Sequence, residues 1–253
     1  MRIVLSITLL LLLSASLGWR AFQRRPAPYP VLPVPARTPA TLPLLAGLPA
    51  PVARFYRLRY GDQVPLIETA VITGRGTMRL LNLPVPIRFR FTHEAGRNYR
   101  HEIELAPFGV PLMRGDETYI DGRGWARTPG GVDEGAGFDQ GSNVSLWVEA
   151  LTWFPAVLVT DQRVRWQAVD DATALLVVPF GSGRETITVR FDPTTGAIEH
   201  VEATKFKSAT GKMTRWVDGT WADEGRPWIQ LEVEELVYNI AVTNAIRNPS
   251  QAR

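Results

Sequence analysis

The stretch SNVSLWVEALTWFPAVL, residues 142–158, sets the architecture of this chain because its pattern is that of a helix without a polar side. Apolar residues recur at helical spacing along one side, at Val144, Trp147, Leu151, Phe154 and Leu158. The other side carries Leu146, Ala150 and Trp153, and the candidate N-caps are Ser142 and Asn143. A helix that is apolar nearly all round should be buried, so we expect it to lie in the concavity of a curved sheet and to end near Pro155.

Two segments before this helix are predicted to pair as a β-hairpin. PIRFRF (86–91) alternates apolar and basic residues, and YRHEIEL (99–105) repeats the alternation. The loop between them, Glu94-Ala95-Gly96, supplies a glycine for the turn. The register that satisfies both charge and hydrophobicity pairs Phe91 with Tyr99, Ile87 with Ile103, and Arg88 with Glu102.

Further alternating segments predict an antiparallel meander. They are RVRWQAV (163–169), TALLVVPF (173–180), ETITVRF (185–191) and AIEHVEATKF (197–206). In IQLEVEELVYNIAV (229–242) the apolar parity changes between Val233 and Leu236, which predicts a β-bulge. Together with a short helix at 52–60, these patterns predict a mainly β (α+β) fold: a curved antiparallel sheet, or half-barrel, wrapped around a buried central helix.

The N-terminus carries the main signal for localisation. Residues 3–19 form an uncharged run of 17 residues, which is the lower limit for a membrane-spanning helix. A retained signal anchor is favoured over a cleaved signal peptide, although Ser16-Leu17-Gly18 also fits a peptidase site. The arginines that follow, at 20, 24 and 25, favour a cytoplasmic location. The charged start before the apolar run favours export, and we expect a membrane-anchored, extracytoplasmic (periplasmic) domain.

Four parts are predicted along the chain. Residues 1–19 are the anchor or signal peptide, and residues 20–47 are a proline-rich linker that favours extended polyproline II. Residues 48–243 form a single β-rich domain, and residues 244–253 form a C-terminal tail. With 253 residues, of which 45% are hydrophobic, the chain is long enough for one sizeable core.

Composition excludes several classes of site and partner. The chain has no cysteine, which rules out disulfides, thiolate catalysis and cysteine-ligated metals. Residues 1–61 hold eight arginines and no lysine or acid, so the net charge of +3 becomes +3 − 8 = −5 for residues 62–253. The basic excess therefore belongs to the N-terminal segment, and no nucleic-acid partner is expected.

Local motifs predict neither a metal nor a cofactor. The histidines His93, His101 and His200 lie in or beside predicted strands without the spacing of a metal motif, and no catalytic residue is predicted. Nucleophile-elbow, P-loop and dinucleotide motifs are missing from the sequence. The glycine-rich segment 128–143 is expected to be a mobile loop, or a lid or rim over a pocket.

Glu149 is the one charged residue of the predicted buried helix. A carboxylate among tryptophans must be paired, hydrogen-bonded or protonated. A structural ion pair with an arginine is the favoured role, ahead of a ligand contact and of acid–base chemistry. If the helix borders an apolar cavity, the candidate ligand-binding residues are Trp147, Glu149, Trp153, Phe154 and Trp125.

The order of several motifs resembles a bacterial protein family. The motifs are LPAPVARFYR (48–57), MRGDETYIDGRGW (113–125), LWVEALTWFPAVL (146–158), VRWQAVDD (164–171) and VRFDPTTGAI (189–198). They resemble family 6544 of the domains of unknown function over about residues 48–240, and the resemblance implies no established activity. By architecture alone, a curved sheet around a buried helix also looks like the half-barrels of lipoprotein-localisation factors.

These observations favour a membrane-tethered, extracytoplasmic β-rich protein that binds an apolar or lipid-like ligand. The expected partners are the membrane, through the N-terminal helix, and a lipid or apolar small molecule. Two alternatives remain: an envelope scaffold that positions protein partners, and, less favoured, a hydrolase that uses carboxylates such as Glu149 or Asp121. A binding role is therefore favoured over an enzymatic one.

Overall fold

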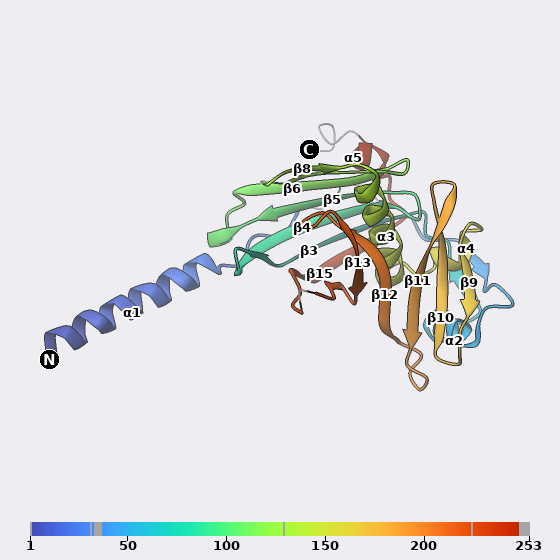
Figure 1. Cartoon of the computed structure of the whole chain (residues 1–253), viewed down its shortest axis with the longest axis horizontal. Helices are drawn as coiled ribbons and strands as arrows, with labels where there is room; N and C mark the ends of the chain where they lie inside the picture. Colours follow the sequence, from blue (N-terminus) through green and yellow to red (C-terminus); the bar gives the residue numbers. More distant parts are fainter. Residues whose placement is uncertain (1, 31, 33–36, 129, 224, 248–253) are drawn as a thin grey trace.

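Two antiparallel sheets dominate the computed structural model, which describes residues 2–30, 32, 37–128, 130–223 and 225–247 (Figure 1). The larger sheet has seven strands in the order β15 (Ile229–Tyr238), β3 (Thr69–Leu80), β4 (Leu83–Glu94), β5 (Asn98–Leu105), β6 (Met113–Ile120), β7 (Arg123–Thr128) and β8 (Gly131–Glu134). The second has six in the order β14 (Thr220–Trp221), β13 (Lys212–Val217), β12 (Ile198–Lys207), β11 (Gly183–Phe191), β10 (Thr173–Phe180) and β9 (Arg165–Ala168). The strands β1 (Thr41–Pro43) and β2 (Gln63–Pro65) form a separate pair.

Helices connect and cover these sheets. They are α1 (Arg2–Phe22), α2 (Ala50–Tyr60), the 3₁₀ turn η1 (Pro107–Gly109), α3 (Ala136–Trp153), α4 (Val157–Thr160) and α5 (Thr243–Arg247). The predicted mainly β, antiparallel fold around a central helix is confirmed, and the described sheets are open rather than closed. The strands form two sheets. The chain completes β3 to β8 of the first sheet, passes through α3, and then forms the second sheet, after which β15 returns to the edge of the first (Figure 1).

Helix α3 lies between the two sheets, where it packs on β6 and β7 on one side and on β12 on the other (Figure 1). Its apolar residues belong to the main core, in which Val144, Leu146, Trp147 and Leu151 are all buried. The predicted burial of an apolar helix is thus confirmed. The helix ends at Trp153, before Pro155, and a separate short helix, α4, follows.

The start of α3 differs from the prediction. The helix begins at Ala136 rather than at Ser142, so half of the predicted loop 128–143 is helical, and β8 takes up another part of it. Two of the glycines that suggested a loop, Gly137 and Gly141, serve packing instead. A Cβ at Gly137 would lie 2.6 Å from the Phe206 ring, and one at Gly141 would lie 3.2 Å from the Phe206 carbonyl oxygen. Helix and strand approach closely only because these side chains are absent.

The hairpin register is shifted by two residues from the predicted one. In the structure Phe91 pairs with His101, Ile87 with Leu105, and Arg88 with Glu104. The strands run on to Glu94 and resume at Asn98, so the turn consists of residues 95–97 instead of 94–96. Because the shift is even, every side chain keeps its predicted face.

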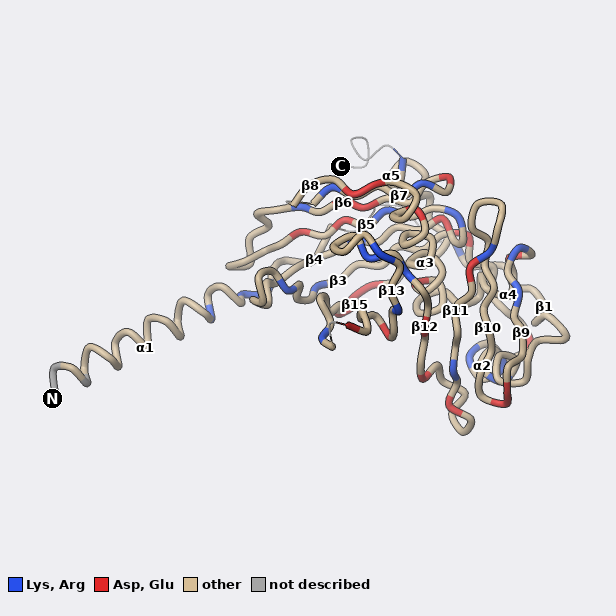
Figure 2. Tube along the Cα trace, viewed as in Figure 1, with Lys and Arg blue, Asp and Glu red and all other residues tan. Residues whose placement is uncertain are grey.

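The charged face of this hairpin is covered by the N-terminal segment. Tyr29 is buried there, and the guanidinium groups of Arg88 and Arg90 lie 5.3 and 5.0 Å from its ring centroid. Arg25 pairs with acids of β15, and Figure 2 shows the mixed charges along β3 to β6. Within the predicted linker 20–47, residues 20–22 belong to α1, the part around Arg25 and Tyr29 packs on the sheet, and residues 41–43 form β1. Residues 31 and 33–36 lie outside the described residues.

Two local predictions are confirmed. The register of β15 against β3 shifts between Val233 and Glu235, as the change of apolar parity indicated. Helix α2 covers the predicted segment 52–60 with two further residues before it, and it buries Val52, Phe55 and Tyr56.

The two ends of the chain differ in exposure. Helix α1 projects from the end of the seven-stranded sheet, and Figure 2 shows that most of it carries no charge. Among the described residues, no helix meets the combined length and hydropathy needed to cross a membrane. The predicted tail 244–253 is helical through Arg247, and its remainder lies outside the described residues.

The close approach of β15 to β3 depends on glycine. A Cβ at Gly76 would overlap the carbonyl oxygen of Gln230, so Gly76→Ala should destabilise the fold by about 1–3 kcal/mol through overpacking. Urea unfolding followed by circular dichroism measures this. The control is Gly115→Ala in β6, where the nearest atoms lie 3.9 Å away and alanine should be neutral or slightly stabilising. Equal stability of the two variants would contradict the argument.

Candidate functional site

A cavity of about 700 Å³ lies between α3 and the two sheets. The seven-stranded sheet contributes Phe91, His101 and Ile103, and β15 contributes Ile229 and Leu231. The second sheet contributes Lys205, Phe206, Trp216 and Trp221, and Trp228 lies just before β15. Helix α3 contributes Val144, Val148, Glu149 and Trp153. Apolar and aromatic side chains therefore make up about half of the lining residues, and charged groups of both signs, among them Glu117, Asp133 and Lys207, also line the cavity.

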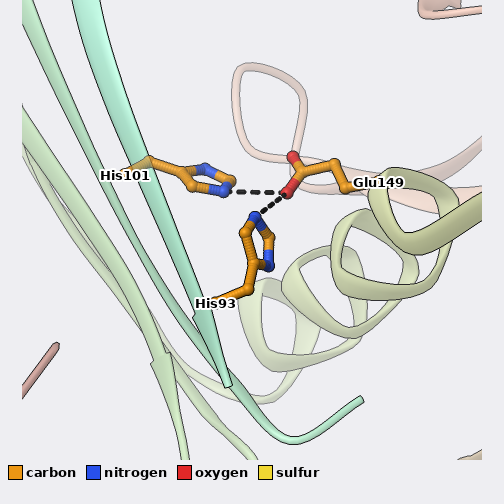
Figure 3. Close-up of side chains that lie close together, drawn as sticks. All are labelled: His93, His101 and Glu149. Carbon is orange, nitrogen blue, oxygen red and sulfur yellow. Dashed lines mark hydrogen bonds and ion pairs between the residues drawn. The ribbon is translucent and has the colours of Figure 1, made fainter. Parts of the chain in front are cut away.

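The polar groups cluster where β4, β5 and α3 meet. His93 and His101 point inward from neighbouring strands, and both direct Nε2 at one carboxylate oxygen of Glu149 (Figure 3). The Nε2 atom of His101 lies 2.9 Å from Glu149 Oε2, and that of His93 lies 3.2 Å from the same oxygen. His93 has no exposed surface, whereas the Glu149 side chain is 18% exposed and borders the cavity.

Opposing effects set the protonation of this cluster. Burial alone would raise the pKa of Glu149, but the two imidazoles outweigh it and lower the pKa to about 2. Burial also disfavours charge on His101, yet Glu149 reverses this and raises the pKa of His101. For His93 burial prevails, and its pKa is lowered. At neutral pH the carboxylate is ionised, and of the two imidazoles it is His101 whose charged form it stabilises enough to outweigh burial.

Aromatic neighbours hold His101 in place. Its ring stacks on Tyr99, with centroids 4.1 Å apart and planes 13° apart, and it lies 4.0 Å from the Phe91 ring on the other side. The Tyr99 hydroxyl donates a hydrogen bond to Glu117, a second carboxylate of the cavity. The imidazole orientation is thus fixed by packing as well as by Glu149.

Lys205 brings a positive charge to the opposite wall. Its Nζ donates a hydrogen bond to Ser145 Oγ at 2.7 Å and lies 5.6 Å from the Trp216 ring and 5.8 Å from the Trp221 ring. Burial lowers the pKa of Lys205, an effect that Glu117 and Glu149 partly oppose. Charged groups of both signs therefore face a mainly apolar space.

The structure brings two of the five predicted ligand residues to the cavity, Glu149 and Trp153. Trp147 and Phe154 are buried in the main core instead. Trp125 lies on the far face of β7, because its neighbour Gly124 contacts α3 and successive strand residues alternate faces. The predicted arginine partner of Glu149 is replaced by two histidines. Asp121 is exposed in the β6–β7 turn and pairs with Arg247, away from the cavity lining.

Sequence reasoning missed the histidines as partners of Glu149. The available signal was their parity, since His93 and His101 share the inward face with Phe91. Among the described residues, His93, His101 and Glu149 form a group that could hold a metal ion, because their ligand atoms all lie within 4.8 Å of one another. Apart from this group, the site is a partly apolar cavity with polar side chains at its inner end.

Comparisons with known proteins supply a family. The model of a family of unknown function, DUF6544, matches residues 38–224. No curated protein matches the sequence. Similar solved structures include a LolA superfamily protein from Nitrosomonas europaea, with 8% identity and a TM-score of 0.41 over 81% of this chain and 100% of that one.

Two further structures are similar at the same level. A DUF1329 family protein from Desulfovibrio piger shares 11% identity at a TM-score of 0.38, over 81% of this chain and 98% of that one. A putative outer membrane lipoprotein-sorting protein domain from Vibrio parahaemolyticus shares 11% identity at a TM-score of 0.34, over 73% and 92%. Likeness of this degree supports no inference about ligand or activity.

The electrostatic coupling of the cluster can be measured directly. Glu149→Gln removes the charge that raises the pKa of His101, so burial should then prevail and the pKa should fall below its ordinary value. Imidazole NMR titration of EDTA-treated protein measures the change. Glu199→Gln, an exposed change in the second sheet, is the control and should leave the His101 titration unaltered. An unchanged or higher pKa in Glu149→Gln would refute the coupling.

Proposed function

We propose that this chain, which belongs to the DUF6544 family of unknown function, is a binding protein that holds an apolar or lipid-like ligand in the cavity beside α3. The observation that carries the proposal is the cavity itself. Its volume of about 700 Å³ falls within the range of small-molecule sites, and about half of its lining side chains are apolar or aromatic, with polar and charged ones among the rest. This composition suits containment of a ligand better than chemistry on it.

The lining supports a ligand with two different ends. Along β5 the cavity is bordered first by Ile103, nearer the strand end, and then by His101 further in. Glu149 lies at this inner end beside His101, and Trp153 follows it by one turn of α3. We assign ligand contact to Glu149 and Trp153, with the polar end of the ligand inward and its apolar part toward the strand ends.

The strand ends form an apolar rim. The β3–β4, β5–β6 and β7–β8 connections and the start of β15 all lie at one end of the sheet, as the pairs Leu80–Leu83, Leu105–Met113, Thr128–Gly131 and Met78–Ile229 require. Exposed apolar side chains gather there: Leu81, Leu83, Phe108, Leu112, Val132 and Trp228. Val132 and Trp228 also line the cavity, so the cavity reaches the rim.

Helix α1 leaves the domain at the same rim (Figure 1). The Phe22 ring lies 5.5 Å from the Phe108 ring, and Gln23 Nε2 donates a hydrogen bond to the Pro84 carbonyl. Leucines 9 to 12 of α1 are each more than 60% exposed. We propose that α1 tethers the domain to a membrane, with the domain on the extracytoplasmic side. The apolar rim then faces the lipid, and a ligand can pass into the cavity without crossing water.

Ligand binding in the cavity predicts a contrast between two tryptophans. Trp153→Glu places a charge against the bound apolar chain, which should weaken binding of a fluorescent fatty acid at least about tenfold, or about 1.4 kcal/mol. The matched control is Trp125→Glu, the same change on the outer face, which should bind within about twofold of the wild type. Thermal unfolding checks that both variants fold. Equal affinities in the two folded variants, or no binding by the wild type, would refute the proposal.

Membrane tethering predicts an effect confined to α1. Replacing Leu11 and Leu12 by arginine should abolish flotation with liposomes, since burying a charged side chain in the apolar part of a bilayer is costly. The control variant has Leu45 and Leu58 replaced by arginine. These side chains are 58% and 65% exposed on the folded domain, and the variant should float with liposomes like the wild type. Rim changes Leu81→Glu and Leu112→Glu should leave flotation intact but slow uptake of the fatty acid from vesicles. Flotation of the α1 variant would exclude the tether.

A further inference from the structure

We propose that His93, His101 and Glu149 bind a divalent transition-metal ion, for which Zn²⁺ is the best fit. Two imidazole nitrogens and one carboxylate oxygen are donors that zinc commonly takes in proteins. This proposal is independent of the ligand proposed above, because it concerns the side chains at the inner end of the cavity whether or not the cavity is filled.

Convergence of the three donors is the first argument. Both Nε2 atoms are directed at Glu149 Oε2, at 2.9 and 3.2 Å, and the group fits within 4.8 Å (Figure 3). A tetrahedral zinc ion with bonds of about 2.0–2.2 Å keeps its ligand atoms about 3.3–3.5 Å apart. The two nitrogen–oxygen distances would need to lengthen by only a few tenths of an ångström to admit the ion, and the two imidazole nitrogens, which lie within 4.8 Å of each other, would need to reach the same spacing.

Rigid support is the second argument. His93 and His101 project from the adjacent strands β4 and β5, and Glu149 projects from α3. The His101 ring lies between Tyr99 and Phe91, and the fully buried His93 ring lies 5.0 Å from Phe154. Donors held on regular elements and fixed by packing keep the geometry that a metal requires.

The hydrogen bonding of His93 is the third argument. Both its Nδ1 and its Nε2 are buried without a hydrogen-bond partner among the described residues, although Nε2 lies 3.2 Å from Glu149 Oε2. A cation between Nε2 and the carboxylate would satisfy the lone pairs of both. Because Nδ1 lacks the acceptor that usually supports a metal-bound imidazole, which contributes roughly 10- to 100-fold in affinity, we expect micromolar rather than nanomolar binding.

The position of the cavity gives the ion an open side. His101 and Glu149 border the cavity, and His93 lies behind them. Three protein ligands with one further position facing the cavity are typical of zinc sites that accept water or a ligand oxygen, rather than of closed structural sites.

The test is metal titration of full-length protein without an affinity tag, after removal of metals with EDTA and dialysis. Co²⁺ should produce visible absorption bands of a low-symmetry site at one equivalent, and Zn²⁺ should displace it. Glu149→Gln and His101→Asn should each weaken binding at least about 100-fold, more than loss of an outer-shell partner does. Zn²⁺ should also raise the unfolding temperature of the wild type but not of these variants.

The control is His200→Asn. His200 is partly exposed in the second sheet, beside Asp218 and Glu202, and is a histidine outside the proposed site. The control should retain one equivalent of metal with unchanged affinity. Absence of binding by the wild type at a Zn²⁺ concentration of about 100 µM, or equal binding by Glu149→Gln and the wild type, would overturn the proposal. Loss of binding in His200→Asn alone would overturn it as well.

Discussion

Burial of α3 on two opposite sides is the constraint on which the rest of the structure depends. One side meets β6 and β7, and the other meets β12, so the helix has little exposed surface, and its two acids, Asp139 and Glu149, are both paired. This burial explains the glycines at positions 137 and 141, because only glycine permits β12 to approach the helix so closely. The pairing of Glu149 follows as well, because a lone carboxylate in that position would be costly without the two histidines. The cavity is the space between the sheets that the helix leaves unfilled.

Local periodicity was enough to predict the strands β4, β5, β9 to β12 and β15 with its bulge, and the helix α2, since each depends on residues close in sequence. It did not predict the other strands, among them β3, β6 and β7 of the larger sheet. The register of the β4–β5 hairpin was not predictable in this way, because charge and hydrophobicity are satisfied equally well by a shift of two residues. Because of this shift, the predicted register did not bring His93 and His101 together. In the predicted register His101 lies opposite Phe89, four residues from His93, whereas in the structure it lies opposite Phe91, two residues from His93. Sequence alone could not show that Trp153 lines the cavity and that Trp125 does not, since each fits the apolar pattern of its own helix or strand.

A buried cluster of two histidines and a glutamate is seldom the most stable way to fill a core. Apolar residues of similar volume often serve as well or better, because they avoid the desolvation of charged groups. Such departures from the pattern of a well-packed core concentrate at functional sites. Here the departure borders the cavity, and the rest of the core, from Val52 on α2 to Ile187 on β11, is mainly apolar, with a few buried polar side chains such as Ser142 and Asn143.

The pairing of β15 with β3 has a consequence for the order of folding. Tyr238 pairs with Ala70, so one edge of the seven-stranded sheet stays open until nearly the whole chain has been synthesised. Contacts between such distant segments form late, since a long loop must close first. Helix α1 is complete long before that moment. If it reaches the membrane first, the domain assembles beside the bilayer, with the unpaired edge of β3 exposed to neighbouring chains in the meantime. The glycines of β3 that later admit β15 also weaken that edge as a template for unwanted pairing.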